Sequence, residues 1–165
     1  TYAHYDILDG VMTMAPAPTV THQRILFRLA RLLDQFVSTQ QLGEVLIAPV
    51  DIIIGREPLR TRQPDLLFVS NEHAIILGDQ VDGAPDLVAE ILSPSNTRSD
   101  LEAKLTDYAT LGVRECWLVS PEARSVEVIR LTDGSWVRVA ISGLGEQVQS
   151  QVLPELQLDV AQLFE

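Results

Sequence analysis

Two short apolar runs on either side of one helical segment constrain the fold of this chain more than any other feature. Residues 86–92 and 115–119 are rich in Leu, Val and Ile and have the length of buried strands. Between them, Ser99 and Glu102 have the spacing of a helix-capping box. The helical pattern there consists of Leu101, Leu105, Tyr108 and Leu111, with Gly112 as a stop signal. A helix between two strands of one sheet is a crossover connection, so we expect these strands to be parallel neighbours in a right-handed unit.

The remaining segments show the same alternation of helical and strand patterns. Residues 21–39 carry apolar side chains at three- and four-residue spacings, with Thr19 or Thr21 as N-cap, which predicts an amphipathic helix. Short apolar runs predict strands over residues 44–48, 51–54 and 65–70. Two-residue turns predict hairpins at Asp9-Gly10 and Asp133-Gly134, and the tail, 154–164, ends in a short predicted helix.

These elements predict an α/β (α+β) fold with a mixed β-sheet flanked by helices and with N-terminal and C-terminal β-hairpins. The chain has 165 residues, of which 46% are hydrophobic, enough to line one sheet and its covering helices. No repeat and no Gly/Ser-rich linker divides it. We therefore expect a single domain over residues 1–165.

No segment of the sequence predicts a membrane span or a secretory signal. The longest stretch without a charged residue, 10–23, is too short to cross a bilayer and is interrupted by Pro16 and Pro18. Residues 1–18 lack a basic start followed by an apolar run. Cys116 is the only cysteine, which excludes an internal disulfide. A cytoplasmic location without membrane association is the resulting expectation.

Two carboxylates stand at positions where burial is expected. Asp65 begins one apolar run, and Glu90 lies inside Leu-Val-Ala-Glu-Ile-Leu. Burying a carboxylate is costly unless it is paired or binds a metal. If the two strands pair, both carboxylates converge at one end of the sheet. Mg²⁺ takes one or two protein carboxylates and leaves its other positions to water and phosphate, so the pair predicts a phosphoryl site rather than a zinc site.

Each of these residues also has a purely structural interpretation. Asp65 could cap a strand entrance, and Glu90 could form a structural salt bridge. Lys104, on the following helix, could point back toward both carboxylates or pair with Asp100 four residues earlier. His22, at the start of the first helix, could reach the site as an accessory residue or lie half-exposed on the surface.

The charge of the chain limits how it could bind nucleic acid. Its formal net charge of -11 argues against binding by electrostatics alone, which needs Lys and Arg. Net charge does not locate the positive residues, however. Three of them, Arg56, Arg60 and Arg62, come just before Asp65. Arg98 belongs to the polar loop 93–99, which could hold a phosphate at a helix start or serve only as a cap.

The order of these motifs resembles that of a known family. The resemblance is to the Uma-type restriction endonuclease family of the PD-(D/E)xK nuclease superfamily, and it covers nearly the whole chain. The segments that carry it are Gln63-Pro-Asp65, then Ala84-Pro-Asp-Leu-Val-Ala-Glu90-Ile-Leu-Ser-Pro-Ser-Asn-Thr, then Asp100 through Lys104 to Tyr108, then Gly112-Val-Arg-Glu-Cys-Trp117-Leu-Val. Several motifs in the correct order make the match specific.

The resemblance implies a restriction-endonuclease-like core of helix, three strands, helix and strand, the order that the patterns also predict. It places the first motif aspartate at Asp65 and the second acidic residue at Glu90. The superfamily's lysine would stand two residues later, where this chain has Leu92. In families of this kind the lysine can come from the following helix, which makes Lys104 the matching residue.

The implied activity is hydrolysis of DNA phosphodiester bonds. Mg²⁺, for which Mn²⁺ can substitute, would bind Asp65, Glu90 and the backbone carbonyl of Ile91. Lys104 would orient the attacking water or stabilise developing negative charge. The residues expected to contact the DNA backbone are Arg56, Arg60, Arg62 and Arg98. Since nucleases that cut both strands often pair two active sites, we also expect a homodimer, with the hairpin over 125–141 as its edge.

Two other functions are compatible with the same residues. The chain could be a catalytically inactive nucleic-acid-binding or assembly module of this fold, because the motif lysine is displaced. It could also be a metal-dependent hydrolase of small phosphoesters, which the acidic net charge would tolerate more easily. DNA and RNA are not distinguished by any motif in the sequence.

Overall fold

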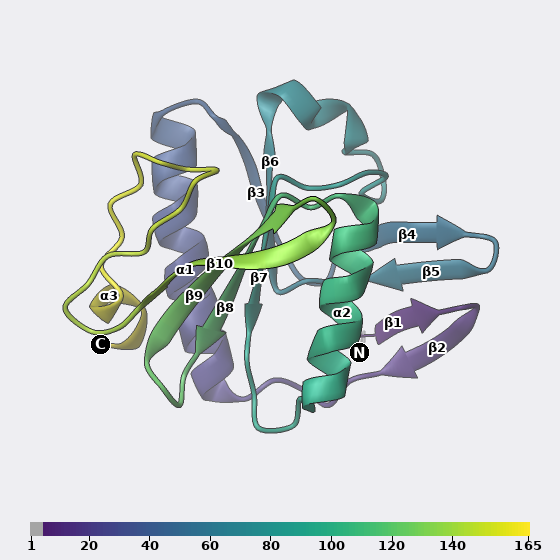
Figure 1. The fold of residues 1–165 in the computed structure, drawn as a ribbon, viewed down its shortest axis with the longest axis horizontal. Coiled ribbons are helices and arrows are strands. Elements are labelled where there is room, and N and C mark those ends of the chain that lie inside the picture. The colour runs from purple at the N-terminus through teal and green to yellow at the C-terminus, as the bar shows by residue number, and fades with distance from the viewer. Residues whose placement is uncertain (1–4) are drawn as a thin grey trace.

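The computed structural model describes residues 5–165, whose strands form two sheets. In chain order the elements are β1 (Tyr5–Leu8), β2 (Val11–Met14), α1 (Val20–Thr39), β3 (Gly43–Ile47), β4 (Ile52–Arg56), β5 (Leu59–Arg62), β6 (Leu66–Ser70), the 3₁₀ helix η1 (Asn71–Ile76), β7 (Leu87–Ile91), α2 (Arg98–Leu111), β8 (Glu115–Ser120), β9 (Ser125–Thr132), β10 (Ser135–Ser142) and α3 (Ala161–Phe164). The larger sheet runs β10-β9-β8-β7-β6-β3 and the smaller runs β2-β1-β5-β4 (Figure 1).

The larger sheet contains the predicted crossover. β7 and β8 are adjacent and parallel, and α2 joins them. The other strand pairs of this sheet, including β6 with β7, are antiparallel. The mixed sheet flanked by helices is therefore confirmed, as is the C-terminal hairpin, formed by β9 and β10.

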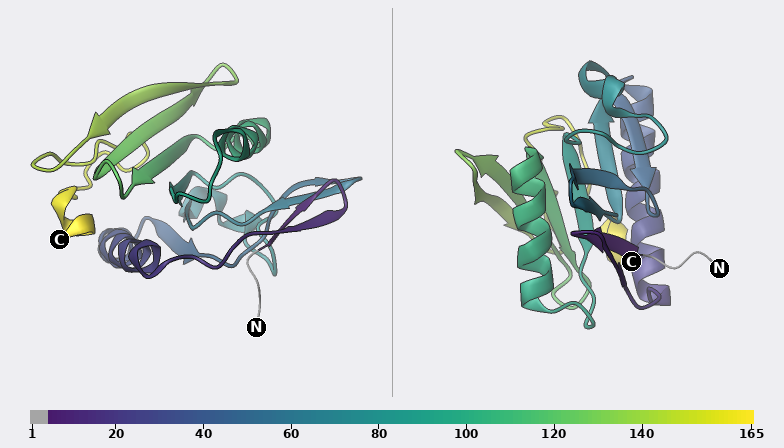
Figure 2. Two further views of the ribbon diagram at one scale, coloured as in Figure 1. Left: turned by 90° about the horizontal axis from the view of Figure 1, so that it is seen from below. Right: turned by 90° about the vertical axis from the view of Figure 1, so that its right-hand side faces the viewer.

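The two long helices cover opposite faces of the larger sheet (Figure 2). Because side chains of a strand alternate between faces, neighbouring residues of one strand belong to different halves of the core. Leu66 and Phe68 of β6 pack in the cluster that contains the buried side of α1. Leu67 and Val69 pack in the cluster that contains Tyr108 of α2. Glu90 lies two residues after Val88, which packs in the same cluster as Tyr108, so the alternation turns Glu90 toward α2.

Capping residues explain where both long helices begin and where α2 ends. The side chain of Thr19 accepts a hydrogen bond from His22 N–H, so Thr19 is the N-cap of α1. The capping box of α2 is formed by Thr97 and Asp100, two residues before the predicted pair. Both pairs have the required spacing, and the chain starts its helix at the earlier one. Gly112 ends α2 with a φ of 98°, a conformation that glycine adopts without steric cost.

A second sheet was not foreseen. The N-terminal hairpin is present, with Asp9 and Gly10 at φ values of 53° and 83° in its turn. Its strand β1 also pairs with β5, which forms a second hairpin with β4. The predicted strands on either side of Pro49 thus belong to different sheets. No helix in residues 5–165 has the length and apolar character needed to cross a bilayer.

Candidate active site

Strand pairing brings the two carboxylates to the same end of the larger sheet. β6 and β7 pair antiparallel, with Leu66 opposite Ala89. Continuing this register by one residue sets Asp65, which directly precedes β6, opposite Glu90. Both residues are buried, at 9% and 5% exposure. Two acidic residues that are 25 positions apart in the sequence therefore become neighbours at the point where β6 begins and β7 ends.

Asp65 is held by a strand on one side and by a helix on the other. Its Oδ2 accepts a hydrogen bond of 2.7 Å from the N–H of Ile91. The Nε2 of His22, in the first turn of α1, lies 3.2 Å from the same oxygen. Because both contacts fall on Oδ2, Oδ1 stays open to further ligands as far as residues 5–165 are concerned.

His22 is positioned toward the site, as one of its two interpretations expected. It is buried, and its Nδ1 lies 3.0 Å from Oε1 of Gln23. The hydrogen bond to Asp65 raises the pKa of His22 above its usual value, against an opposing effect of burial. The imidazole therefore favours its charged form next to this carboxylate.

Glu90 points to the opposite helix. The hydroxyl of Tyr108 donates a hydrogen bond of 2.5 Å to its Oε1, and Lys104 Nζ lies 3.4 Å from its Oε2. Burial raises the pKa of Glu90 to about 7, and the neighbouring Asp65 adds to this effect. The positive charge of Lys104 and the hydrogen bond from Tyr108 act in the other direction.

The side chain of Lys104 points to Glu90 rather than to Asp100 on the helix surface. Its side chain is only 17% exposed and contacts Glu90 across the start of α2. The charge of Glu90 raises the pKa of Lys104, so the amine stays protonated. Asp100, its alternative partner, instead accepts from the N–H of Thr97. The structure thus brings the ammonium group to the carboxylate pair.

These residues line one cleft with a volume of about 530 Å³. Its walls come from the loop before α1, from the start of α1, from the ends of β6 and β7 and from the loop before α2. The candidate site residues on its lining are His22, Asp65, Glu90, Ile91 and Lys104. All five had been assigned to one site from the sequence, and the structure places them on one surface.

The arginines expected to contact DNA do not gather at this cleft. Arg62 is buried, and it donates to Asp6 and to Asp107 at 3.0 and 2.7 Å. Arg60 donates to both carboxylate oxygens of Asp107. Arg62 therefore cannot serve as a surface contact, and this assignment is corrected: a buried ion network holds its guanidinium.

The other two arginines lie on the surface and have acidic partners. Arg56 contacts Asp82 at 2.6 Å, and Arg98 contacts Glu102 at 3.1 Å on the same helix. Their contact with DNA stays a prediction. In the loop before α2, Ser95 N–H donates to Ser93 Oγ, so an anion there would compete with the loop's own hydrogen bonds.

Tyr108 is the site residue that sequence reasoning missed. It was interpreted as part of the apolar face of a helix and as the end of one segment of the family resemblance, with no role in the site, and its ring is indeed fully buried. Its hydroxyl, however, is the donor that orients Glu90. The available signal was its spacing: Tyr108 lies four residues after Lys104, on the same face of α2.

The donor set fits a hard divalent cation better than a zinc ion. Within residues 5–165, no three side chains of His, Cys, Asp or Glu are grouped so that they could hold a metal. Asp65 and Glu90 offer carboxylate oxygens on the lining of one cleft. Mg²⁺ is commonly bound through one or two carboxylates, with water in its other positions. Asp65 and Glu90 meet this requirement, and the carbonyl of Ile91 as a further ligand stays a prediction.

Comparisons with known proteins identify the family and the fold of this chain. The model of a family named Uma2 and described as "Putative restriction endonuclease" matches residues 2–161. No curated protein matches the chain. Among solved structures, a "putative nuclease belonging to DUF820" from Anabaena variabilis ATCC 29413 is similar, with a TM-score of 0.77 and 19% identity over 97% of this chain and 89% of the other. At this identity the likeness shows a shared fold.

Proposed function

Because this chain belongs to the Uma2 family of restriction endonuclease-like proteins, we propose that it is a metal-dependent endonuclease that hydrolyses DNA phosphodiester bonds in the cleft between α1 and α2. One observation carries the proposal: Asp65, Glu90 and Lys104, from three different elements, line the same cleft. Family membership supports a nuclease, while the metal and the DNA substrate are our inference.

The two carboxylates are the proposed ligands of Mg²⁺ or Mn²⁺, together with the carbonyl of Ile91. When bound, the cation would lower the pKa of a coordinated water and offset negative charge on the phosphate. The chain supplies the orientation of the ligands. Ile91 N–H and His22 hold Asp65, and Tyr108 holds Glu90.

The motif lysine of the superfamily is absent, because Leu92 occupies its position. We propose that Lys104 takes its role. Its ammonium is positioned beside Glu90 and opens onto the cleft, where a scissile phosphate would lie. A fixed positive charge at this place stabilises the charge that grows on the phosphate as the P–O bond breaks. In the same position it can also orient the attacking water.

The test is nicking of supercoiled plasmid with Mg²⁺ or Mn²⁺. We expect Asp65→Asn and Glu90→Gln to lower the rate by about 100-fold or more, since each removes a charged ligand while keeping the shape of the side chain. Asp82→Asn is the matched control, because its carboxylate is exposed and, among residues 5–165, its ion-pair partner is the surface residue Arg56. Cleavage that survives both site changes would remove this assignment.

Metal binding can be measured without turnover. A cation that binds only the folded protein raises the melting temperature by an amount that grows with the logarithm of its concentration over Kd. We expect Mn²⁺ to stabilise the wild-type chain and Asp82→Asn, but not Asp65→Asn or Glu90→Gln. An equal shift in all four proteins would place the cation elsewhere.

A small-phosphoester hydrolase is the second candidate, favoured by the net charge of -11. The same protein is therefore assayed with a chromogenic phosphodiester, with duplex DNA and with single-stranded DNA and RNA. Turnover of the small ester alone would favour this candidate over the nuclease. Metal binding without any turnover would favour an inactive binding module.

A further inference from the structure

Helix α1 carries three arginines that have no acidic partner within residues 5–165. Seven of the twelve Lys and Arg residues form ion pairs with carboxylates within residues 5–165. The remaining five are Arg24, Arg28, Arg31, Arg124 and Arg130. Three of these five lie within three turns of α1, and the sequence has no Asp or Glu from position 10 to position 33. In a chain of net charge -11, this segment is locally positive.

Part of this charge lies on one exposed stripe of the helix. Val20, Arg24, Phe27 and Arg31 follow each other at spacings of four, three and four residues, which keeps them on one face. All four are exposed, Val20 at 67% and Phe27 at 69%. We call these four residues the α1 stripe. An aromatic ring exposed to this extent between two arginines is not explained by core packing.

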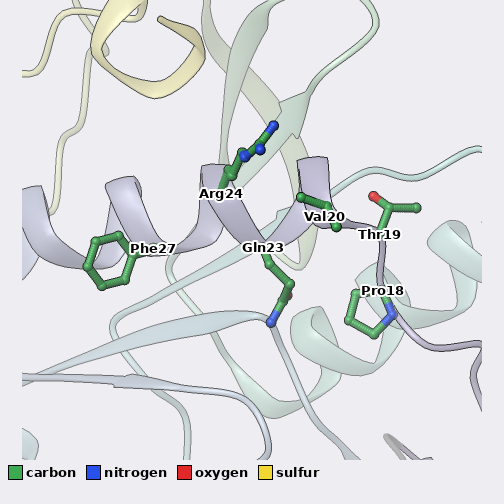
Figure 3. Close-up of a pocket in the computed structure, with 6 residues that line it drawn as sticks. All are labelled: Pro18, Thr19, Val20, Gln23, Arg24 and Phe27. Carbon is green, nitrogen blue, oxygen red and sulfur yellow. The ribbon is translucent and has the colours of Figure 1, made fainter.

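The α1 stripe adjoins the candidate active site. An open pocket of about 370 Å³ is lined by Pro18, Thr19, Val20, Gln23, Arg24 and Phe27, which Figure 3 shows from the residues before α1 to the second turn of the helix. Three of these residues, Pro18, Thr19 and Gln23, also line the cleft of Asp65 and Glu90. The pocket that contains Val20, Arg24 and Phe27 is therefore adjacent to the cleft, and Arg31 lies one turn further along α1.

We propose that the α1 stripe binds unpaired nucleotides of the nucleic-acid substrate next to the scissile bond, with a base stacked on Phe27 and phosphates on Arg24 and Arg31. The occupant is single-stranded because bases inside a duplex are stacked on each other and do not offer a face to a protein ring. Aromatic rings beside arginines along a groove are the usual means of binding a single strand. This inference rests on the proposed nuclease function, for which it names the form of the substrate.

The experiment measures binding by fluorescence anisotropy of a labelled single strand and of a labelled duplex, in EDTA. We expect the single strand to bind more tightly. Phe27→Leu should raise its Kd about tenfold, because leucine is apolar but cannot stack on a base. Phe27→Tyr, which keeps the ring, should bind as the wild type does. Arg24→Gln should raise the Kd and lower the salt dependence by about one counterion.

Arg124→Gln is the matched control, since Arg124 is exposed, is one of the five arginines without a carboxylate partner within residues 5–165 and lies outside both pockets. It should leave the Kd unchanged. A Kd that is unaffected by Phe27→Leu, or raised equally by Arg124→Gln, would overturn the proposal. So would tighter binding of duplex than of single strand.

Two further outcomes separate this proposal from its alternatives. If Phe27→Leu and Arg24→Gln change the molar mass in light scattering instead of the Kd, the stripe is a contact between copies of the chain and the proposal is overturned. Because binding is measured without metal, a protein that binds single strands through Phe27 but cuts nothing would support the stripe and contradict only the nuclease function.

Discussion

Glu90 is held in an environment that favours its neutral form in the absence of a cation. The folded protein raises its pKa from 4.5 to about 7, chiefly through burial. Between these two values the folded state keeps a proton that the unfolded state has lost. Folding stability must therefore decrease as the pH rises through this window. His22 acts in the same direction, because its raised pKa makes its stabilising contribution disappear at high pH.

Glu90→Gln should remove the part of this pH dependence of folding stability that is due to Glu90. In EDTA we expect the wild-type chain to lose roughly 3 kcal/mol, relative to Glu90→Gln, between about pH 4.5 and pH 7. Urea unfolding at several pH values measures the difference between the two proteins. If the free energy of unfolding changes with pH in the same way in both proteins, Glu90 has an ordinary pKa in the folded state.

Lys104 and Tyr108 predict shifts in the pH dependence of cleavage. Both groups lower the pKa of Glu90, so removing either should raise it and move the acidic limb of the rate profile to higher pH. Lys104→Met should also lower the rate on the plateau by about 100-fold, because the fixed charge is lost. Tyr108→Phe should shift the limb with a much smaller loss on the plateau.

Metal-dependent nicking measured over a range of pH tests both variants. Thr106→Ala is the control, because Thr106 is an exposed residue of the same helix whose hydroxyl donates to the carbonyl of Glu102. If Tyr108→Phe lowers the plateau and leaves the limb in place, Tyr108 acts on the packing of α2 and not on Glu90.

At the scale of elements, a buried ion network fastens α2 to the smaller sheet. Asp107 of α2 accepts hydrogen bonds from Arg60 and Arg62 of β5, and Asp6 of β1 also accepts from Arg62. Lys104 and Tyr108 lie on the same helix, so the network fixes their position relative to Glu90. The smaller sheet therefore helps to position α2, although none of its strands lines the cleft.

Asp107→Asn should lower the free energy of unfolding by roughly 3 kcal/mol, because it leaves the buried charge of Arg62 with only one acidic partner. Asp9→Asn is the control: Asp9 also contacts Arg60, but its side chain is 67% exposed. Its loss should cost less than about 1 kcal/mol. Thermal or urea unfolding measures both. Equal effects would mean that burial does not strengthen the Asp107 contacts.

At the scale of the whole molecule, the homodimer stays a prediction that the larger sheet makes testable. β10 is an edge strand of this sheet, and its Val137 and Ile141 are 51% and 54% exposed. An apolar edge strand can pair with a second copy. We expect light scattering to give the mass of a dimer, and Val137→Lys to give that of a monomer. A wild-type monomer would contradict this prediction.

Local patterns were sufficient for most of the elements, though not for β5 or η1, and for singling out the central pair of residues. The periodicity of residues 21–39 and the helix between two apolar runs predicted α1, α2 and the parallel pair β7–β8. A carboxylate inside an apolar strand marked Glu90, because the cost of burying it demands a partner whatever the fold. These signals are properties of short segments, so they can be interpreted before the chain is folded.

The partners of the charged side chains were decided only by the tertiary structure. Arg62 and Lys104 are both cations close to acidic residues in the sequence, yet Arg62 is enclosed by Asp6 and Asp107 while Lys104 opens onto the cleft. The pairing of β1 with β5 and the contact of Tyr108 with Glu90 likewise join distant segments. Such contacts depend on how whole elements pack, because the energy of an ion pair is set by burial and geometry that no local pattern contains.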